Sequence, residues 1–144
     1  ITETAVVRNL ERAQRCIRRL RKLGCRLALD DFGTGYCSFA YLKDLPVQYI
    51  KIDGVSVRDL LENPLSDAIV ASVASLAQVM KCATIAEHVE NDLVIQRLRQ
   101  HEIDFVQGFA IGRPQRLVDA IREMGDAVAH GAAEILAEPE AQPS

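Results

Sequence analysis

The 144-residue chain has few of the features that mark a secreted or membrane-spanning protein. It contains no Trp, and aromatic residues make up only 5% of it. No stretch approaches the run of about 18 apolar residues that a membrane-spanning helix needs. Residues 1–7 lack the basic start and apolar run of a signal peptide. We therefore expect a cytoplasmic protein with no membrane contact by this segment.

Cysteine is present but lacks the spacing of a metal site. Cys16, Cys25, Cys37 and Cys82 form no Cys-x-x-Cys pair, and no histidine stands at zinc-ligand spacing. We expect all four cysteines to be reduced thiols. Cys37 is the one candidate for redox sensitivity, because it lies in a candidate active-site loop after Asp30-Asp31.

Basic residues are absent from the end of the chain and crowded near its start. Eight of the 17 lie between Arg8 and Arg26, and none follows Arg122. The arginines alternate with apolar residues at helical spacing, and no aromatic side chains are interleaved. This pattern is typical of a solvated helix face, so we expect no binding to a nucleic-acid polymer.

Hydrophobic periodicity predicts strands and helices in alternation. A helix with apolar positions from Val6 to Leu20 ends near Gly24 and precedes a strand ending at Asp30. Further strands are expected over residues 47–53, 84–89 and 105–109. Helices are expected after Asn63-Pro64, after Asn91 and around 117–121. This order predicts an α/β fold with a parallel sheet, either an open doubly wound sheet or part of a barrel.

Polar residues at the ends of four successive strands favour the barrel. They are Asp30 with Asp31, Lys51 with Asp53, Glu87, and Gln107. In (β/α)8 enzymes the active site lies at this rim, and paired carboxylates are suitable ligands for Mg²⁺ or Mn²⁺.

Each residue also has a structural alternative. Asp30-Asp31 could mark a chain reversal, and Lys51 could pair with Asp53. Glu87 could cap the helix that begins near Asn91, and Gln107 could satisfy backbone groups at the rim.

The motifs together resemble the C-terminal portion of an EAL domain, the family of bacterial cyclic di-GMP phosphodiesterases. The resemblance runs from Ile1 to about Arg122 and implies that residues 1–124 are the C-terminal portion of an EAL domain. Beyond it, apolar spacing and acidic composition predict a C-terminal helix and acidic tail over 125–144. The resemblance is carried by five motifs in the family's order, namely Ile1-Thr2-Glu3, Asp30-Asp31-Phe32-Gly33-Thr34-Gly35-Tyr36, Lys51-Ile52-Asp53, Ala86-Glu87-His88-Val89-Glu90, and Val106-Gln107-Gly108-Phe109 with Arg113-Pro114.

The resemblance implies a fold and a reaction. The fold would be the C-terminal part of a (β/α)8 TIM-like barrel, incomplete in this chain, and the reaction would be hydrolysis of cyclic di-GMP to linear pGpG. Asp30 would bridge two Mg²⁺ or Mn²⁺ ions, Asp31 and Glu87 would hold the second, and Lys51 would orient or deprotonate the attacking water.

The resemblance also implies substrate contacts and a dimer. Gln107 and Pro114 would contact the substrate. His88, which departs from the family pattern at the same mouth, could stack on a guanine or could be a tolerated rim histidine with no ligand role. Glu3 would brace the loop that includes Phe32, Gly33, Thr34 and Gly35, and would couple that loop to homodimerisation. Upstream sensory or GGDEF-type modules are expected in the same polypeptide.

Three departures separate this chain from the family pattern. The Glu-Ala-Leu signature, an asparagine ligand and a further glutamate would precede Ile1, so we expect this segment alone to be inactive, with the Asp30 strand exposing an unpaired edge and an apolar face. His88 stands where the family usually has glycine, and Gly54-Val55-Ser56 replaces a bulkier segment. A catalytically silent cyclic di-GMP receptor and a protein-interaction module are the alternatives.

Overall fold

The computed structural model describes residues 1–33, 42, 45–122 and 124–125. The chain forms two compact units, Ile1–Gly112 and Arg113–Ser144. Cys37, Thr34, Gly35 and the acidic tail lie outside the described residues.

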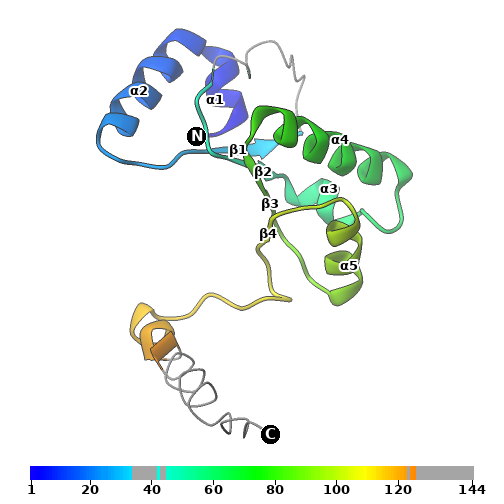
Figure 1. The fold of residues 1–144 in the computed structure, drawn as a ribbon. Coiled ribbons are helices and arrows are strands. Elements are labelled where there is room, and N and C mark those ends of the chain that lie inside the picture. The colour runs from blue at the N-terminus through cyan, green and yellow to red at the C-terminus, as the bar shows by residue number, and fades with distance from the viewer. Residues whose placement is uncertain (34–41, 43–44, 123, 126–144) are drawn as a thin grey trace, which may run out of the picture. The chain divides into compact units, whose positions relative to one another are not determined.

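The first unit has its strands in the predicted order along the chain, with helices before the first strand and between the last three (Figure 1). Its elements are α1 (Glu3–Arg8), α2 (Leu10–Lys22), β1 (Ala28–Phe32), β2 (Tyr49–Ile52), α3 (Gly54–Arg58), α4 (Pro64–Met80), β3 (Ala83–Ala86), α5 (Asp92–Gln100) and β4 (Phe105–Val106). The four strands pair in parallel in the order β1-β2-β3-β4. Strands that follow one another in both chain and sheet are the arrangement of a (β/α)8 barrel, whereas a doubly wound sheet reverses its order.

Asparagine and glycine set the helix boundaries. The side chains of Asn63 and Asn91 accept backbone N–H groups at the starts of α4 and α5, which confirms both predicted caps. Gly24 has φ +82° and its N–H donates to the Arg21 carbonyl. The Cys25 N–H reaches back to Leu20, which completes a Schellman motif.

The predicted first helix is in fact two helices. Asn9 interrupts it with φ −157° and ψ 84°, a non-helical conformation that ends α1, and its side chain accepts the N–H of Arg12 to begin α2. An asparagine side chain that competes for backbone N–H groups explains the break. The apolar periodicity crosses the break unchanged, so it did not reveal the boundary.

The β1 edge is partly covered by the start of the chain, which corrects the expectation that it is unpaired. The Asp30 N–H donates to the Ile1 carbonyl at 2.8 Å, and the Ile1 nitrogen donates to Ala28 at 2.9 Å. A single parallel bridge joins Thr2 to Asp30. Two residues of strand pairing therefore stand beside β1.

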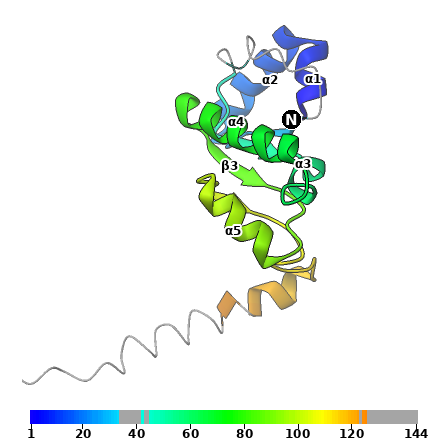
Figure 2. The ribbon, with the colours of Figure 1, turned by 90° about the vertical axis from the view of Figure 1, so that its right-hand side faces the viewer.

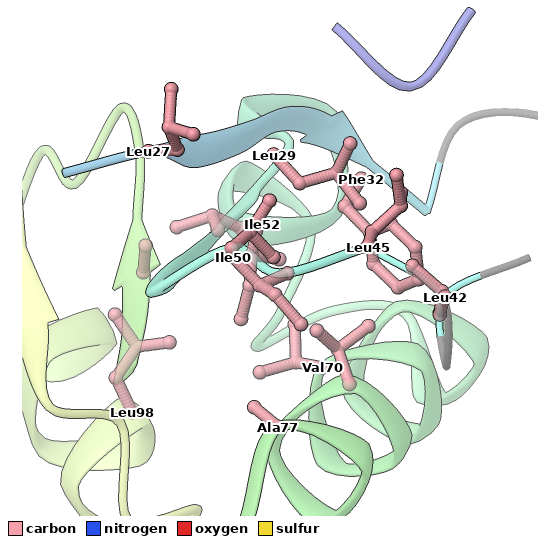
Figure 3. Packing of buried hydrophobic residues seen from close by; sticks show 14 of the residues in the cluster. Leu27, Leu29, Phe32, Leu42, Leu45, Ile50, Ile52, Val70, Ala77 and Leu98 are labelled. Atoms are coloured by element: carbon pink, nitrogen blue, oxygen red, sulfur yellow. The ribbon is translucent and has the colours of Figure 1, made fainter. Parts of the chain in front are cut away.

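The two faces of the sheet have different surroundings. Ile50 and Ile52 are fully buried and face α4, whose Val70 and Ala77 cover them (Figure 3). On the opposite face, Tyr49 is half-buried and contacts Phe105 edge-to-face, with ring centroids 6.3 Å apart. Phe105 is 53% exposed. One covered and one partly open face are expected of an incomplete barrel wall.

The second unit contains a short helix at 117–122, as the apolar spacing predicts. Its Leu117, Val118 and Ile121 side chains are exposed. Within the described ranges, none of the helices has both the length and the apolar content to cross a bilayer.

Candidate metal and catalytic site

A bulge at the end of β1 places two adjacent carboxylates at one rim. Leu29 pairs with Ile50 and Phe32 pairs with Ile52, so two residues of β1 stand opposite the single residue Lys51. Successive side chains of a regular strand point to opposite faces, and a bulge removes that alternation. Asp31 has φ +58°, a left-handed conformation that Asp tolerates better than most residues.

The bulge brings three predicted metal ligands together. One carboxylate oxygen from each of Asp30, Asp31 and Glu87 lies within 4.8 Å of the other two. The Glu87 side chain is 12% exposed and that of Asp30 33%, so the cluster is sheltered but open to solvent. Three hard anionic oxygens at this separation fit the ligand preference of Mg²⁺ or Mn²⁺.

Lys51 stands between two of these carboxylates. Its Nζ donates to Asp30 Oδ1 at 2.7 Å and lies 2.5 Å from Glu87 Oε1. Burial lowers the pKa of the Lys51 ammonium, but the hydrogen bonds to Asp30 and Glu87 outweigh that effect and leave its pKa raised. In this arrangement Lys51 is a cation that balances part of the charge of the cluster.

The structure contradicts two of the structural alternatives, the Lys51–Asp53 ion pair and the cap of α5 by Glu87. Asp53 Oδ2 accepts the Val55 N–H at 2.8 Å and caps α3, a helix that the sequence pattern did not reveal. Asn91, rather than Glu87, caps α5. Lys51 pairs with Asp30 and Glu87 instead of with Asp53. At Gln107 it is the backbone that makes rim hydrogen bonds: its N–H donates to the Ala86 carbonyl at 2.8 Å, and its carbonyl accepts the Val89 N–H at 3.1 Å.

A small pocket adjoins the carboxylate cluster and shares Glu87 with it. Its volume is about 170 Å³, and it is lined by Glu87, His88, Glu90, Gln107, Gly108 and Phe109. Two of the predicted substrate residues, Gln107 and His88, are therefore in its wall. The third, Pro114, belongs to the second unit.

Beside this pocket, the His88 side chain packs directly against Gly54. A Cβ added to Gly54 would stand 2.2 Å from His88 Nδ1 and 2.9 Å from His88 Cβ, so the histidine occupies the space of a Gly54 side chain. His88 itself has φ +55°. The departures expected at His88 and at Gly54 are thus one local arrangement, which no spacing in the sequence indicates because the two residues are far apart in the chain.

Glu3 connects the first helix to the loop after β1. Its side chain is buried, and Oε2 accepts the Gly33 N–H at 3.3 Å. Phe32 is also buried, at 1% exposed, whereas Thr34 and Gly35 are not among the described residues. The resemblance implies a contact between Glu3 and this loop, and the role of Glu3 in ordering the loop stays a prediction.

Known proteins resemble this chain in sequence. Residues 1–114 match the EAL domain family. The chain is 50% identical over 117 residues to cyclic di-GMP phosphodiesterase PdeB of Shewanella oneidensis, covering 81% of the chain and 14% of that protein. It is 41% identical over 124 residues to cyclic di-GMP phosphodiesterase PdeF of Escherichia coli, covering 86% of the chain and 17% of that protein. The chain therefore spans less than a fifth of the length of either relative.

Solved structures agree with the sequence relatives. The PaMucR phosphodiesterase in complex with c-di-GMP superposes with a TM-score of 0.80 at 31% identity, over 83% of this chain and 49% of that one. The FimX EAL domain from Pseudomonas aeruginosa bound to c-di-GMP gives a TM-score of 0.74 at 30% identity, over 80% of this chain and 47% of that one. Sequence match, sheet order and rim motifs therefore agree, and the chain belongs to the EAL domain family.

Proposed function

We propose that this chain supplies one part of a metal-dependent site that hydrolyses cyclic di-GMP to linear pGpG in the complete protein. The observation that carries the proposal is the convergence of Asp30, Asp31 and Glu87 within 4.8 Å at the rim of the sheet. Relatives named as cyclic di-GMP phosphodiesterases, and a related phosphodiesterase in complex with c-di-GMP, support the choice of substrate.

The carboxylates would hold two Mg²⁺ or Mn²⁺ ions. Asp30 would be shared between both, while Asp31 and Glu87 would hold the second. Such ions neutralise charge on a phosphodiester and make water acidic enough to yield a nucleophile near neutral pH. The fit rests on donor chemistry, since clustered carboxylates are stabilised by a divalent cation.

The remaining residues would orient the attacking water or bind the substrate. Lys51 would donate a hydrogen bond to the attacking water from its position between Asp30 and Glu87. Gln107 and His88 line the adjoining pocket and would contact the substrate, joined by Pro114.

The proposal extends to the setting of the site. Glu3, Phe32 and Gly33, with Thr34 and Gly35, would order the loop after β1 and link it to a cytoplasmic homodimer. Upstream sensory or GGDEF-type modules would regulate it. Further metal ligands would come from outside these residues, so the 144 residues alone should be inactive.

The test is Glu87→Gln in the full-length protein. This change keeps the shape of the side chain but removes one anionic ligand, so we expect Mg²⁺-dependent pGpG production to fall by about 10²-fold or more. Glu62→Gln is the control and should leave pGpG production unchanged, because Glu62 is an exposed glutamate outside both the adjoining pocket and the carboxylate cluster.

Two results would contradict the proposal. Unchanged turnover in Glu87→Gln would show that Glu87 has no role in the proposed hydrolysis. A wild-type protein that binds cyclic di-GMP in calorimetry but releases no pGpG would instead be a silent receptor.

A further inference from the structure

Charge is distributed very unevenly over this chain. Residues 8–26 hold eight of the 17 basic residues but only one of the 20 acidic ones, so a net charge of +7 in this segment stands against −10 in the rest. Local charge of this size produces a potential that extends about a Debye length from the surface.

The helical period gathers most of these cations on one side of α2. Each of Arg12, Arg15, Arg18, Arg19 and Lys22 stands three, four or seven residues from other members of the set, which places them on one face. We call these five residues the α2 cationic face. They extend over about 15 Å of helix and line a single surface hollow together with Cys16.

The opposite side of α2 is committed to the core. Ile17 is fully buried, and Leu10, Ala13 and Leu20 pack against the same core. The α2 cationic face therefore points outward, and all five side chains are exposed. Figures 1 and 2 show α2 beside α1 and away from α5, and Figure 1 also shows it apart from α4.

The described residues do little to neutralise this face. Among them, the only carboxylate paired with it is Glu11, 3.6 Å from Arg15, and both side chains are more than half exposed. Leu23 adds an apolar element, since it is 79% exposed and stands four residues after Arg19 on the same side of the helix.

We propose that the α2 cationic face docks on the surface of a membrane that contains anionic phospholipid. Cations would meet the phosphate-bearing headgroups, which guanidinium groups bind in a bidentate manner, and Leu23 would enter the interface. An exposed leucine among arginines suits a lipid interface better than a phosphate duplex, and residues 8–26 have no aromatic side chain to stack on single-stranded bases. Peripheral docking of this kind needs no membrane-spanning helix. The proposal departs from the expectation that this segment makes no membrane contact.

The test measures partition of the full-length protein onto vesicles of phosphatidylcholine alone and of phosphatidylcholine mixed equally with phosphatidylglycerol. The variant Arg12→Gln/Arg18→Gln/Arg19→Gln removes three cations and preserves helix propensity. Each cation contributes about fivefold to binding, so the variant should partition roughly 100-fold less onto anionic vesicles. The matched control is Arg99→Gln/Arg116→Gln/Arg122→Gln, which has the same net charge and changes exposed arginines elsewhere.

The outcomes are distinguishable from one another and from failure of the proposed hydrolysis. Binding that needs phosphatidylglycerol, weakens in about 1 M salt, survives in the control and is lost in the α2 variant supports the proposal. Leu23→Ser should reduce vesicle binding but leave binding to inorganic polyphosphate unchanged. Equal binding to neutral vesicles, equal loss in both triple variants, or binding to duplex DNA but not to vesicles overturns it. Circular dichroism of each variant shows that α2 still folds.

Discussion

Replacing Gly54 by alanine would place a methyl group where the His88 side chain now stands. The added carbon would be 2.2 Å from His88 Nδ1, 2.6 Å from Cγ and 2.9 Å from Cβ. Rotation about χ1 could move the ring but not Cβ, so the backbone near one of the two residues must also shift. The three nearest atoms all belong to His88, and therefore the largest part of the conflict should depend on that residue.

Two opposing terms determine the size of the effect. Alanine favours the first turn of α3 over glycine by up to about 1 kcal/mol, because it has less backbone freedom to lose. Overpacking costs about 1–3 kcal/mol. Gly54→Ala should therefore be neutral to destabilising by about 2 kcal/mol in the wild type. In a His88→Gly background the steric term disappears, and the same change should stabilise by roughly 0.5–1 kcal/mol.

The effect of Gly54→Ala is measured in both backgrounds by hydrogen exchange of the α3 amides, read by mass spectrometry in the full-length protein. The exchange rates give the free energy of local opening. The expected coupling between the two changes is about 1–3 kcal/mol. Gly112→Ala is the control, because nothing lies within 4 Å of the added carbon there. A coupling below about 0.5 kcal/mol would show that His88 does not fill the Gly54 space.

Two further predictions concern ion pairs. Lys51→Gln leaves the clustered carboxylates without their cation, so without divalent metal it should destabilise by about 1–3 kcal/mol, while Mg²⁺ should restore the midpoint of thermal unfolding. Exposed Lys81→Gln is its control, and an equal loss with and without Mg²⁺ would oppose this reasoning. Hydrogen bonds from Arg97 and His101 hold the pKa of Asp67 far below its usual range, so their stabilisation is complete above about pH 4 and is lost as the pH falls. Asp67→Asn should thus lower stability by about 1 kcal/mol at neutral pH and by less at acid pH in urea denaturation, and a gap that widens on acidification would contradict the assignment.

Local signals predicted most of the fold. Strand order, the Asn63 and Asn91 caps and the Gly24 terminus follow from short-range chemistry that the sequence displays directly. The rim placement of Asp30 and Glu87 follows from parallel strands ending on one side.

The features that the sequence did not predict depend on contacts between distant residues or on side chains that compete for backbone N–H groups. The division at Asn9 and the short α3 after Asp53 arise where side chains capture backbone N–H groups within an otherwise continuous pattern. The bulge at Asp31 is set by pairing with β2, and the position of His88 by the absence of a side chain at Gly54. Neither arrangement has a period or spacing that a sequence could reveal.

The central claim is that Asp30, Asp31 and Glu87 form one cation-binding cluster. Anomalous diffraction from Mn²⁺-soaked crystals of the full-length protein tests it most directly. We predict an anomalous peak about 2.0–2.2 Å from carboxylate oxygens of Asp30 and Asp31, with Glu87 beside it, and no such peak in Glu87→Gln crystals soaked at limiting Mn²⁺. A peak bound elsewhere, or none at this rim in the wild type at saturating Mn²⁺, would contradict the account.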